Sequence, residues 1–292
     1  MVIHSIYNYI SVFSGGGGLD LAVQLAVPKA RCVCHVEIEV AAATILASRM
    51  AEGSLDEAPI WSDARTFDGR PWRGRVGGII AGFPCPDYSV AGQRKGITGE
   101  HGQLWYPLAS IIREVGPSWI FLENVPGILN PHRNKETKEV EYPAGIDFVL
   151  GDLAEMGFDA EWGCCAASAV GASHKRERWW CLAVANTLGA GLEEWRCERG
   201  DDGAECAATE RASVPFFAPG PSSPDWADLL VRYPWMRPAL AQAEAQSVIY
   251  RDFDGMAALV ADTRTDALRA AGNGAVALAG ASALRELLRR IS

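Results

Sequence analysis

One cysteine of this chain, Cys85, lies between two prolines just beyond the apolar run 76–81. Such a run, bounded by glycines, is typical of a buried strand, and open α/β sheets place their chemistry at the carboxyl ends of these strands. A single thiol is more often a buried structural residue. Here the prolines and the nearby Ser89 favour an ordered, exposed loop. The pattern therefore predicts a nucleophile that would react as the thiolate.

Three other segments place glycines or polar residues at the ends of apolar runs. Four consecutive glycines, 15–18, join an apolar strand to a helix. A second apolar strand leads directly into Glu123 and Asn124, and Arg176 and Arg178 stand just before a third apolar run. A carboxyl group, two guanidinium groups and a thiol are side chains suited to nucleophilic catalysis with proton transfer.

In this order, the four blocks resemble the DNA (cytosine-5)-methyltransferase family of bacterial or phage type. The matching features are a glycine-rich cofactor loop, Pro-Cys, Glu-Asn-Val and Arg-x-Arg, and the segment 271–276 resembles the closing Gly-Asn block of the family. The resemblance spans about residues 9–185 and 250–285. A glycine-rich loop alone is a weak signal, whereas an ordered set of blocks is specific.

The resemblance implies methyl transfer from S-adenosyl-L-methionine to carbon 5 of a cytosine in duplex DNA. Carbon 5 is a poor nucleophile until a thiolate adds to carbon 6, which is the role expected of Cys85. Glu123 would supply a proton at N3 if burial raises its pKa. Arg178, with Arg176 behind it, would stabilise charge that develops at O2. The cytosine must leave the base stack for this chemistry, and Asn124 would help to fix the loop.

The resemblance also implies where the cofactor binds. The glycines would let the backbone approach its methionine end, Glu37 would accept the ribose hydroxyls, and Ile38 would pack on the adenine. Asp63 would meet the adenine amino group, although a turn residue would explain this position nearly as well. The expected cofactor-binding residues are Phe13, Ser14, Gly15, Gly17, Gly18, Leu19, Glu37, Ile38, Asp63, Ala64, Pro84, Asn273 and Ala275.

The formal net charge of −9 counts against a nucleic-acid partner at first sight. Phosphate binding needs local cations, however, rather than a basic chain. The residues expected to contact DNA are Ser89, Arg94, Lys95, Asn124, Lys175, Arg196 and Arg232. A further basic group, at positions 65–75, is expected to be solvated surface charge. The acidic total predicts weak non-specific binding that falls as salt rises.

Several positions depart from the family pattern. Gly16 stands where a bulkier apolar residue is usual, Pro86 replaces a glutamine after the cysteine, and His174 replaces a glutamine before Lys175. These departures concern the loop geometry and the form of the cofactor that binds, not the reaction type.

Composition limits the remaining possibilities. The eight cysteines include no Cys-x-x-Cys pair, so reduced thiols and no metal site are expected. No run approaches the roughly 18 apolar residues of a membrane span, and no basic-then-apolar leader opens the sequence. We therefore expect a monomer without membrane association, in the cytoplasm of a bacterial or phage-infected cell.

Strands are expected at 9–13, 31–36, 76–81, 119–122 and 180–185, and helices at 19–26, 40–50, 104–115, 146–156 and 276–291. Their alternation predicts an α/β fold, a doubly wound parallel sheet with helices on both faces, and the resemblance implies a Rossmann-like methyltransferase domain built from residues 1–185 and 251–292. In the family the last helix returns to pack against the first strand. Residues 186–250, with few aliphatic side chains, predict a short, partly flexible target-recognition region.

Two other functions stay open. A group of tRNA cytosine-5 methyltransferases shares these blocks, and a catalytically silent nucleic-acid-binding module could retain the cofactor site. The intact Pro-Cys and Glu-Asn-Val blocks argue against a silent module. The absence of an extended basic surface in the sequence argues against a structured RNA substrate.

Overall fold

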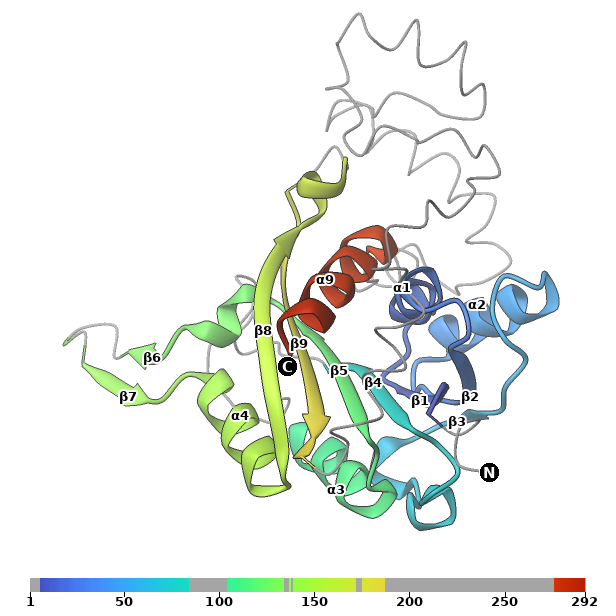
Figure 1. Cartoon of the computed structure of the whole chain (residues 1–292), viewed down its shortest axis with the longest axis horizontal. Helices are drawn as coiled ribbons and strands as arrows, with labels where there is room; N and C mark the ends of the chain where they lie inside the picture. Colours follow the sequence, from blue (N-terminus) through green and yellow to red (C-terminus); the bar gives the residue numbers. More distant parts are fainter. Residues whose placement is uncertain are drawn as a thin grey trace, which may run out of the picture.

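The computed structural model describes residues 6–83, 104–133, 137, 139–171, 175–186 and 276–291. Within these ranges the chain forms a seven-stranded sheet with the order β3-β2-β1-β4-β5-β9-β8 (Figure 1). A separate two-stranded ribbon, β6-β7, extends away from this sheet.

Five strands of the sheet are parallel. They are β1 (Asn8–Val12), β2 (Arg31–Val36), β3 (Ile60–Trp61), β4 (Gly78–Gly82) and β5 (Trp119–Asn124). From β1 the chain adds β2 and β3 on one side, and then β4 and β5 on the other. The strand order therefore reverses between β1 and β4. In open α/β sheets the carboxyl ends of strands at such a point form the ligand-binding crevice.

The two remaining strands close one side of the sheet. β9 (Glu177–Ala185) pairs antiparallel with β5, and β8 (Phe158–Ala166) pairs antiparallel with β9. Because β9 runs opposite to β5, the first residues of β9 lie beside the last residues of β5, at the carboxyl ends of the parallel strands. This arrangement brings the Arg-x-Arg block beside the Glu-Asn-Val block.

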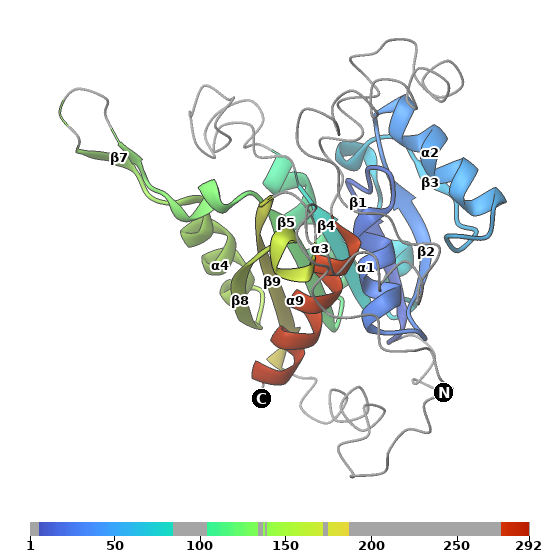
Figure 2. The same cartoon turned by 90° about the horizontal axis from the view of Figure 1, so that it is seen from above.

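Helices cover both faces of the sheet (Figures 1 and 2). On one face, α1 (Gly18–Ala26) lies beside α9 (Ala277–Arg290), and on the other lie α3 (Trp105–Val115) and α4 (Gly145–Glu155). α2 (Val40–Ala51) follows β2. The short 3-10 helices are η2 (Ala64–Thr66), η3 (Arg70–Trp72), η6 (Pro126–Leu129) and η7 (Ala167–Val170), and the ribbon consists of β6 (His132–Arg133) and β7 (Val140–Tyr142).

The apolar run of β5 explains its central place. Ile120 and Leu122 belong to the core beneath α3 and α4, whereas Trp119 and Phe121 belong to the core beneath α1 and α9. A strand that is buried on both faces has a continuous apolar run in the sequence, whereas a strand with one exposed face alternates apolar and polar residues. The helices of the described part of the chain include none that is both long and apolar enough to cross a membrane.

The predicted α/β fold class is confirmed, and the expected strands and helices occur with ends shifted by three residues or fewer. Two expectations are wrong. The sheet is not wholly parallel, because β8 and β9 run antiparallel to their neighbours. The last helix packs chiefly against α1, β8 and β9 instead of the first strand. An added Cβ at Gly280 would lie 2.7 Å from the Cβ of Ala22, so small residues allow α9 to approach α1 closely.

Candidate active site

The loop between β1 and α1 is a tight turn in unusual backbone conformations. Phe13, Gly15 and Gly17 have φ values of 54°, 54° and 77°. Glycine adopts this region readily, whereas a phenylalanine there stores strain of about 1–3 kcal/mol that the surroundings must hold. An added Cβ at Gly17 would lie 2.5 Å from Cδ1 of Leu55. The backbone conformation therefore favours glycine at position 17, and a larger residue would also have to displace the Leu55 side chain.

Glu37 lies directly after β2 and contacts this loop. Its Oε2 accepts a hydrogen bond from the backbone N–H of Gly15 at 2.7 Å, and its Oε1 accepts one from the N–H of Glu39 at 2.8 Å. Only 9% of Glu37 is exposed. A carboxylate offers about four acceptor positions, so Glu37 can hold the loop and still accept hydrogen bonds from a ligand.

Asp63 caps η2 and pairs with Arg65. Its side chain accepts hydrogen bonds from the backbone N–H of Arg65 at 2.9 Å and from Nη2 of the same residue at 2.9 Å. The hydrogen bonds from Arg65 lower the pKa of Asp63 below its ordinary value. Ala64, beside it, is buried. The turn that the sequence offered as an alternative is present, and contact with adenine stays a prediction.

Glu123 and Arg178 form a mostly buried pair across β5 and β9. Oε1 of Glu123 lies 2.9 Å from Nε of Arg178, and the two side chains are 13% and 18% exposed. Glu123 is the register partner of Gly82 on β4, where an added Cβ would lie 3.2 Å from Oε2 of Glu123. The glycine therefore leaves room for the carboxyl group at the end of β4.

Burial and charge act in opposite directions on this carboxyl group. Burial raises the pKa of Glu123 above its ordinary value, and the neighbouring Arg178 and Arg176 only partly offset that increase. Burial also lowers the pKa of the Arg176 guanidinium, and the charge of Arg178 acts in the same direction. Arg176 has a φ of 27°, a rare value for a residue other than glycine. Such strained positions cluster at functional sites.

Asn124 fixes the end of β4. Its Nδ2 donates a hydrogen bond to the carbonyl oxygen of Phe83 at 3.1 Å, and its Oδ1 accepts one from the N–H of Val125 at 2.8 Å. The side chain is 3% exposed. Phe83 is the last described residue before Pro84 and Cys85, so Asn124 anchors the point from which the cysteine loop departs.

A family model described as C-5 cytosine-specific DNA methylase matches residues 7–204. The chain belongs to this family. It is 27% identical over 179 residues to the type II methyltransferase M.CviJI of Paramecium bursaria Chlorella virus IL3A, covering 61% of this chain and 43% of that protein. It is 30% identical over 195 residues to M.Eco47II of Escherichia coli, covering 66% and 43%. The matches thus span less than half the length of these relatives.

A similar solved structure is the methyltransferase EhMeth of Entamoeba histolytica. The TM-score is 0.48 at 18% sequence identity, and the match covers 61% of this chain and 52% of that chain.

The described methyltransferase blocks lie at the carboxyl ends of the parallel strands. The glycine loop and Glu37 follow β1 and β2, while Glu123, Asn124, Arg176 and Arg178 lie at the end of β5 and the start of β9. The strand between these two groups is β4, and Cys85 follows it in the sequence. The described blocks therefore share the end of the sheet at which the parallel strands terminate, and the role of each residue stays a prediction.

Other expected site residues lie at the surface or outside the described ranges. Ile38 is 56% exposed, and Lys175 is 78% exposed and pairs with Glu177 at 3.1 Å. In the basic group at 65–75, Arg65 and Arg70 pair with neighbouring carboxylates, as expected of surface charge. Pro84, Cys85, Ser89, Arg94, Lys95, Arg196, Arg232, Asn273 and Ala275 lie outside the described residues, as does nearly all of the region 186–250.

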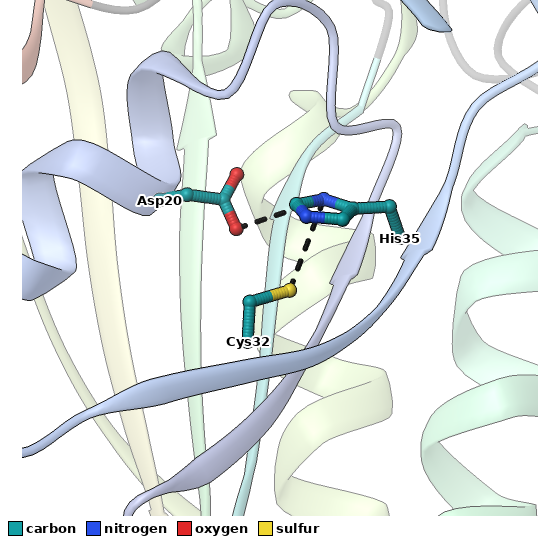
Figure 3. A group of neighbouring side chains, drawn as sticks. All are labelled: Asp20, Cys32 and His35. Carbon is teal, nitrogen blue, oxygen red and sulfur yellow. Dashed lines mark hydrogen bonds and ion pairs between the residues drawn. The ribbon is translucent and has the colours of Figure 1, made fainter. Parts of the chain in front are cut away.

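Sequence reasoning missed one polar group beneath the glycine loop. Asp20, Cys32 and His35 are buried and bring their polar atoms within 4.8 Å of one another (Figure 3). The sequence offered only a weak signal for this group, because Asp20 is remote in sequence from Cys32 and His35.

Proposed function

We propose that this protein transfers a methyl group from S-adenosylmethionine to carbon 5 of a cytosine that has been flipped out of duplex DNA. The observation that carries the proposal is the buried pair of Glu123 and Arg178, one strand away from the end of β4 that leads to Cys85. Membership of the C-5 cytosine-specific DNA methylase family supports the same reaction class.

Cys85 would act as the nucleophile. Its thiolate adds to carbon 6 of the cytosine, and the electron pair of the 5,6 double bond becomes available at carbon 5 for the methyl group. Methyl transfer would release S-adenosylhomocysteine, after which a base such as water takes the carbon 5 proton and departure of the thiolate restores the double bond. Since Asn124 holds the carbonyl of Phe83, it would set the position from which the cysteine loop reaches the base. Asn124 thereby acts as a positioning residue in this proposal.

Glu123 and the arginines would manage charge on the pyrimidine. Addition at carbon 6 moves negative charge toward N3 and O2, where a proton donor and a cation stabilise it. The raised pKa of Glu123 favours a protonated carboxyl that can serve N3. Arg178, now against Glu123, would meet O2, and Arg176 adds a second positive charge beside it.

The described residues fit S-adenosylmethionine, which supplies an electrophilic methyl group. An added Cβ at Gly15 would meet no atom within 4 Å, so the loop leaves open space there for a ligand. Glu37 has acceptor capacity left for ribose hydroxyls. Ile38 and Trp61 expose 56% and 46% of their surface at the adjoining ends of β2 and β3, apolar surface that an adenine ring could cover.

The partner would be duplex DNA, with residues 186–250 as the target-recognition region. Lys175, whose side chain projects into solvent, would meet phosphate. The family description and the names of the relatives favour DNA over tRNA. A tRNA substrate would therefore appear as an alternative outcome of the test.

The test is covalent trapping with duplex DNA that carries 5-fluorocytosine, in the presence of S-adenosylmethionine. Fluorine at carbon 5 cannot leave as a proton would, so the enzyme should accumulate as a DNA adduct. Cys85→Ser should abolish the adduct. Cys164→Ser, at an exposed thiol on β8, is the matched control and should retain it. Trapping on 5-fluorocytosine tRNA alone, or on neither substrate, would overturn the proposal.

A further inference from the structure

A buried polar cluster lies next to the glycine loop, between β1, α1 and β2. Its members are Ser11, Ser14, Asp20, Cys32 and His35, each no more than 6% exposed. Figure 3 shows Asp20 from α1 and Cys32 from β2 directed toward the His35 ring. Buried polar groups are costly unless they have partners, so the contacts within this cluster matter for the loop above it.

The hydrogen bonds of Ser14 favour one tautomer of His35. The Ser14 hydroxyl donates to the carbonyl oxygen of Ser11 at 2.9 Å, and Nδ1 of His35 lies 3.3 Å from the same hydroxyl oxygen. Since a hydroxyl has one proton to donate, Ser14 must accept from His35. This arrangement assigns the proton of the imidazole to Nδ1, directed at the loop.

Asp20 faces the imidazole from the side of α1. Its Oδ2 accepts a hydrogen bond from the Ser11 hydroxyl at 3.0 Å, and its Oδ1 lies 3.8 Å from Nδ1 of His35. Asp20 belongs to the first turn of α1, the helix that begins where the glycine loop ends. The imidazole thus contacts Ser14 at the start of the loop and a residue of the helix that follows the loop.

We propose that His35 is a positioning residue for the cofactor, one that holds the glycine loop in its binding conformation through Ser14. This inference rests on the proposed function for the identity of the ligand. Three consecutive residues at the end of β2 act together on the loop. His35 contacts the Ser14 side chain, Val36 accepts from the Ser14 N–H at 3.3 Å, and Glu37 accepts from the Gly15 N–H.

The loop needs such support because its backbone is strained. Phe13, directly before Ser14, has a φ of 54°, a value that is strained for a residue other than glycine. Conformations of this kind persist only when the surroundings over-determine them. Without the contact from His35, the side chain of Ser14 would keep only its bond to Ser11, and the loop should sample other conformations more often.

A bound metal ion is the rival explanation for Asp20, Cys32 and His35. A thiol must lose its proton to bind zinc. Here Sγ of Cys32 donates to the carbonyl oxygen of Cys34 at 3.4 Å, and burial raises the pKa of the Cys32 thiol well above its ordinary value. In the assigned tautomer, Nδ1 of His35 donates to Ser14. The observations therefore favour a hydrogen-bonded network over a metal site.

The experiment compares His35→Leu with His35→Asn and with a control, Cys34→Ala. Asparagine can place an amide N–H near the position of Nδ1, whereas leucine cannot donate. Cys34 lies on the same strand but packs into the core on the opposite face of the sheet. The readouts are the dissociation constant for S-adenosylmethionine, KM and kcat, and hydrogen exchange of residues 14–19 in the protein without cofactor.

We expect His35→Leu to weaken S-adenosylmethionine binding and to raise its KM about tenfold, with kcat within about twofold of the wild type. Exchange at residues 14–19 should accelerate in the same variant. His35→Asn should recover most of both losses, and Cys34→Ala should behave as wild type. If His35→Leu lost stability while cofactor affinity and exchange at residues 14–19 stayed unchanged, His35 would have only a structural role and the inference would be overturned.

Two other results would also overturn it. The first is unchanged cofactor affinity and loop exchange in folded His35→Leu. The second is a stoichiometric metal in the wild type that is lost in His35→Leu and in Cys32→Ser. Should the leucine variant fail to fold, Asp20→Asn provides the test, with the same readouts and a smaller expected effect. If the wild type binds no S-adenosylmethionine, the proposed function fails, while exchange at residues 14–19 still decides the role of His35.

Discussion

Glu123 and Arg178 lie 2.9 Å apart, Oε1 to Nε, at the point where β5 ends and the antiparallel strand β9 begins. The pair is mostly buried, and burial has a greater effect on the carboxyl group than the two neighbouring guanidinium groups do. A carboxyl whose pKa is raised can hold a proton at pH values where an ordinary carboxyl has lost it. A nearby guanidinium can meanwhile stabilise negative charge on a bound substrate.

Replacing the carboxyl should remove the proposed proton donor. We expect Glu123→Gln to lower kcat at least about a hundredfold, because general acid catalysis commonly contributes about 10²–10⁴-fold. Affinity for S-adenosylmethionine should stay near that of the wild type. Single-turnover methylation of duplex DNA measures the rate, and Glu155→Gln, at an exposed carboxyl on α4, is the control. A Glu123→Gln enzyme with near-normal turnover would exclude the acid role.

The pH profile gives a second measure of the same group. The reaction needs Glu123 protonated, so kcat/KM should fall as pH rises through its folded pKa. Because burial raises that pKa, the decline should occur above the ordinary value of 4.5. Glu123→Gln should lose this part of the profile. If kcat/KM of Glu123→Gln still falls over the same pH range, another group causes the decline and the proposed role of Glu123 is wrong.

Asn124 is expected to position the loop that carries Cys85 and to take no direct part in the reaction. Asn124→Ala removes the hydrogen bond to the Phe83 carbonyl and should misplace the loop that begins at Pro84. We expect the rate of adduct formation with 5-fluorocytosine DNA to fall about ten- to a hundredfold, since small displacements of a nucleophile are costly. Asn130→Ala, at an exposed asparagine after η6, should have no effect. Equal rates for both variants would contradict the anchoring role.

Much of this site could be predicted from the sequence because its residues follow strands that are buried on both faces. The apolar run Trp119–Leu122 has to be a central strand. A carboxyl group directly after it has to lie at the carboxyl ends of the parallel strands. From the sequence, a raised pKa of Glu123 was the condition for its role as proton donor, and burial in the structure acts in that direction. These inferences need only local apolar patterns and the direction of the strands.

The network around His35 could not be predicted in this way, because it depends on an irregularity in strand pairing. Tyr9 pairs with Cys32, but the next residue of β1, Ile10, pairs with Cys34. The shift puts Cys32 and Cys34 into the cores on opposite faces of the sheet, although a period of two places them on one face. β8 was missed for another reason. It lies at an edge of the sheet, with a mixture of buried and exposed residues instead of an apolar run.

The glycine loop allows a test with a close control. Gly17→Ala introduces a Cβ at a φ of 77° and within 2.5 Å of Leu55. We expect a loss of about 1–2 kcal/mol in the free energy of unfolding, together with weaker binding of S-adenosylmethionine. Gly151→Ala lies inside α4 with open space around it, and should stabilise the protein by about 0.5–1 kcal/mol. Equal effects of the two substitutions in denaturant unfolding would contradict the constraint at Gly17.

Asp20 connects the buried cluster to the pH dependence of stability. Burial raises its pKa above the ordinary value of 3.8, although the nearby His35 acts in the opposite direction. The folded state therefore binds this proton more tightly than the unfolded chain does. The stability contributed by the protonated group is fully present below the unfolded pKa, near 3.8, and is lost as pH rises through the raised folded value.

Asp20→Asn should remove that dependence, because an amide does not titrate. The asparagine can still accept the hydrogen bond from Ser11, so the variant should fold. We expect the stability of Asp20→Asn relative to the wild type to increase as pH rises from about 4 to about 7. Urea unfolding across this range measures the difference, and Asp159→Asn, at an exposed carboxylate on β8, is the control. A difference that does not change with pH would mean that Asp20 has the same pKa in the folded and unfolded chains, and that burial does not govern its ionisation.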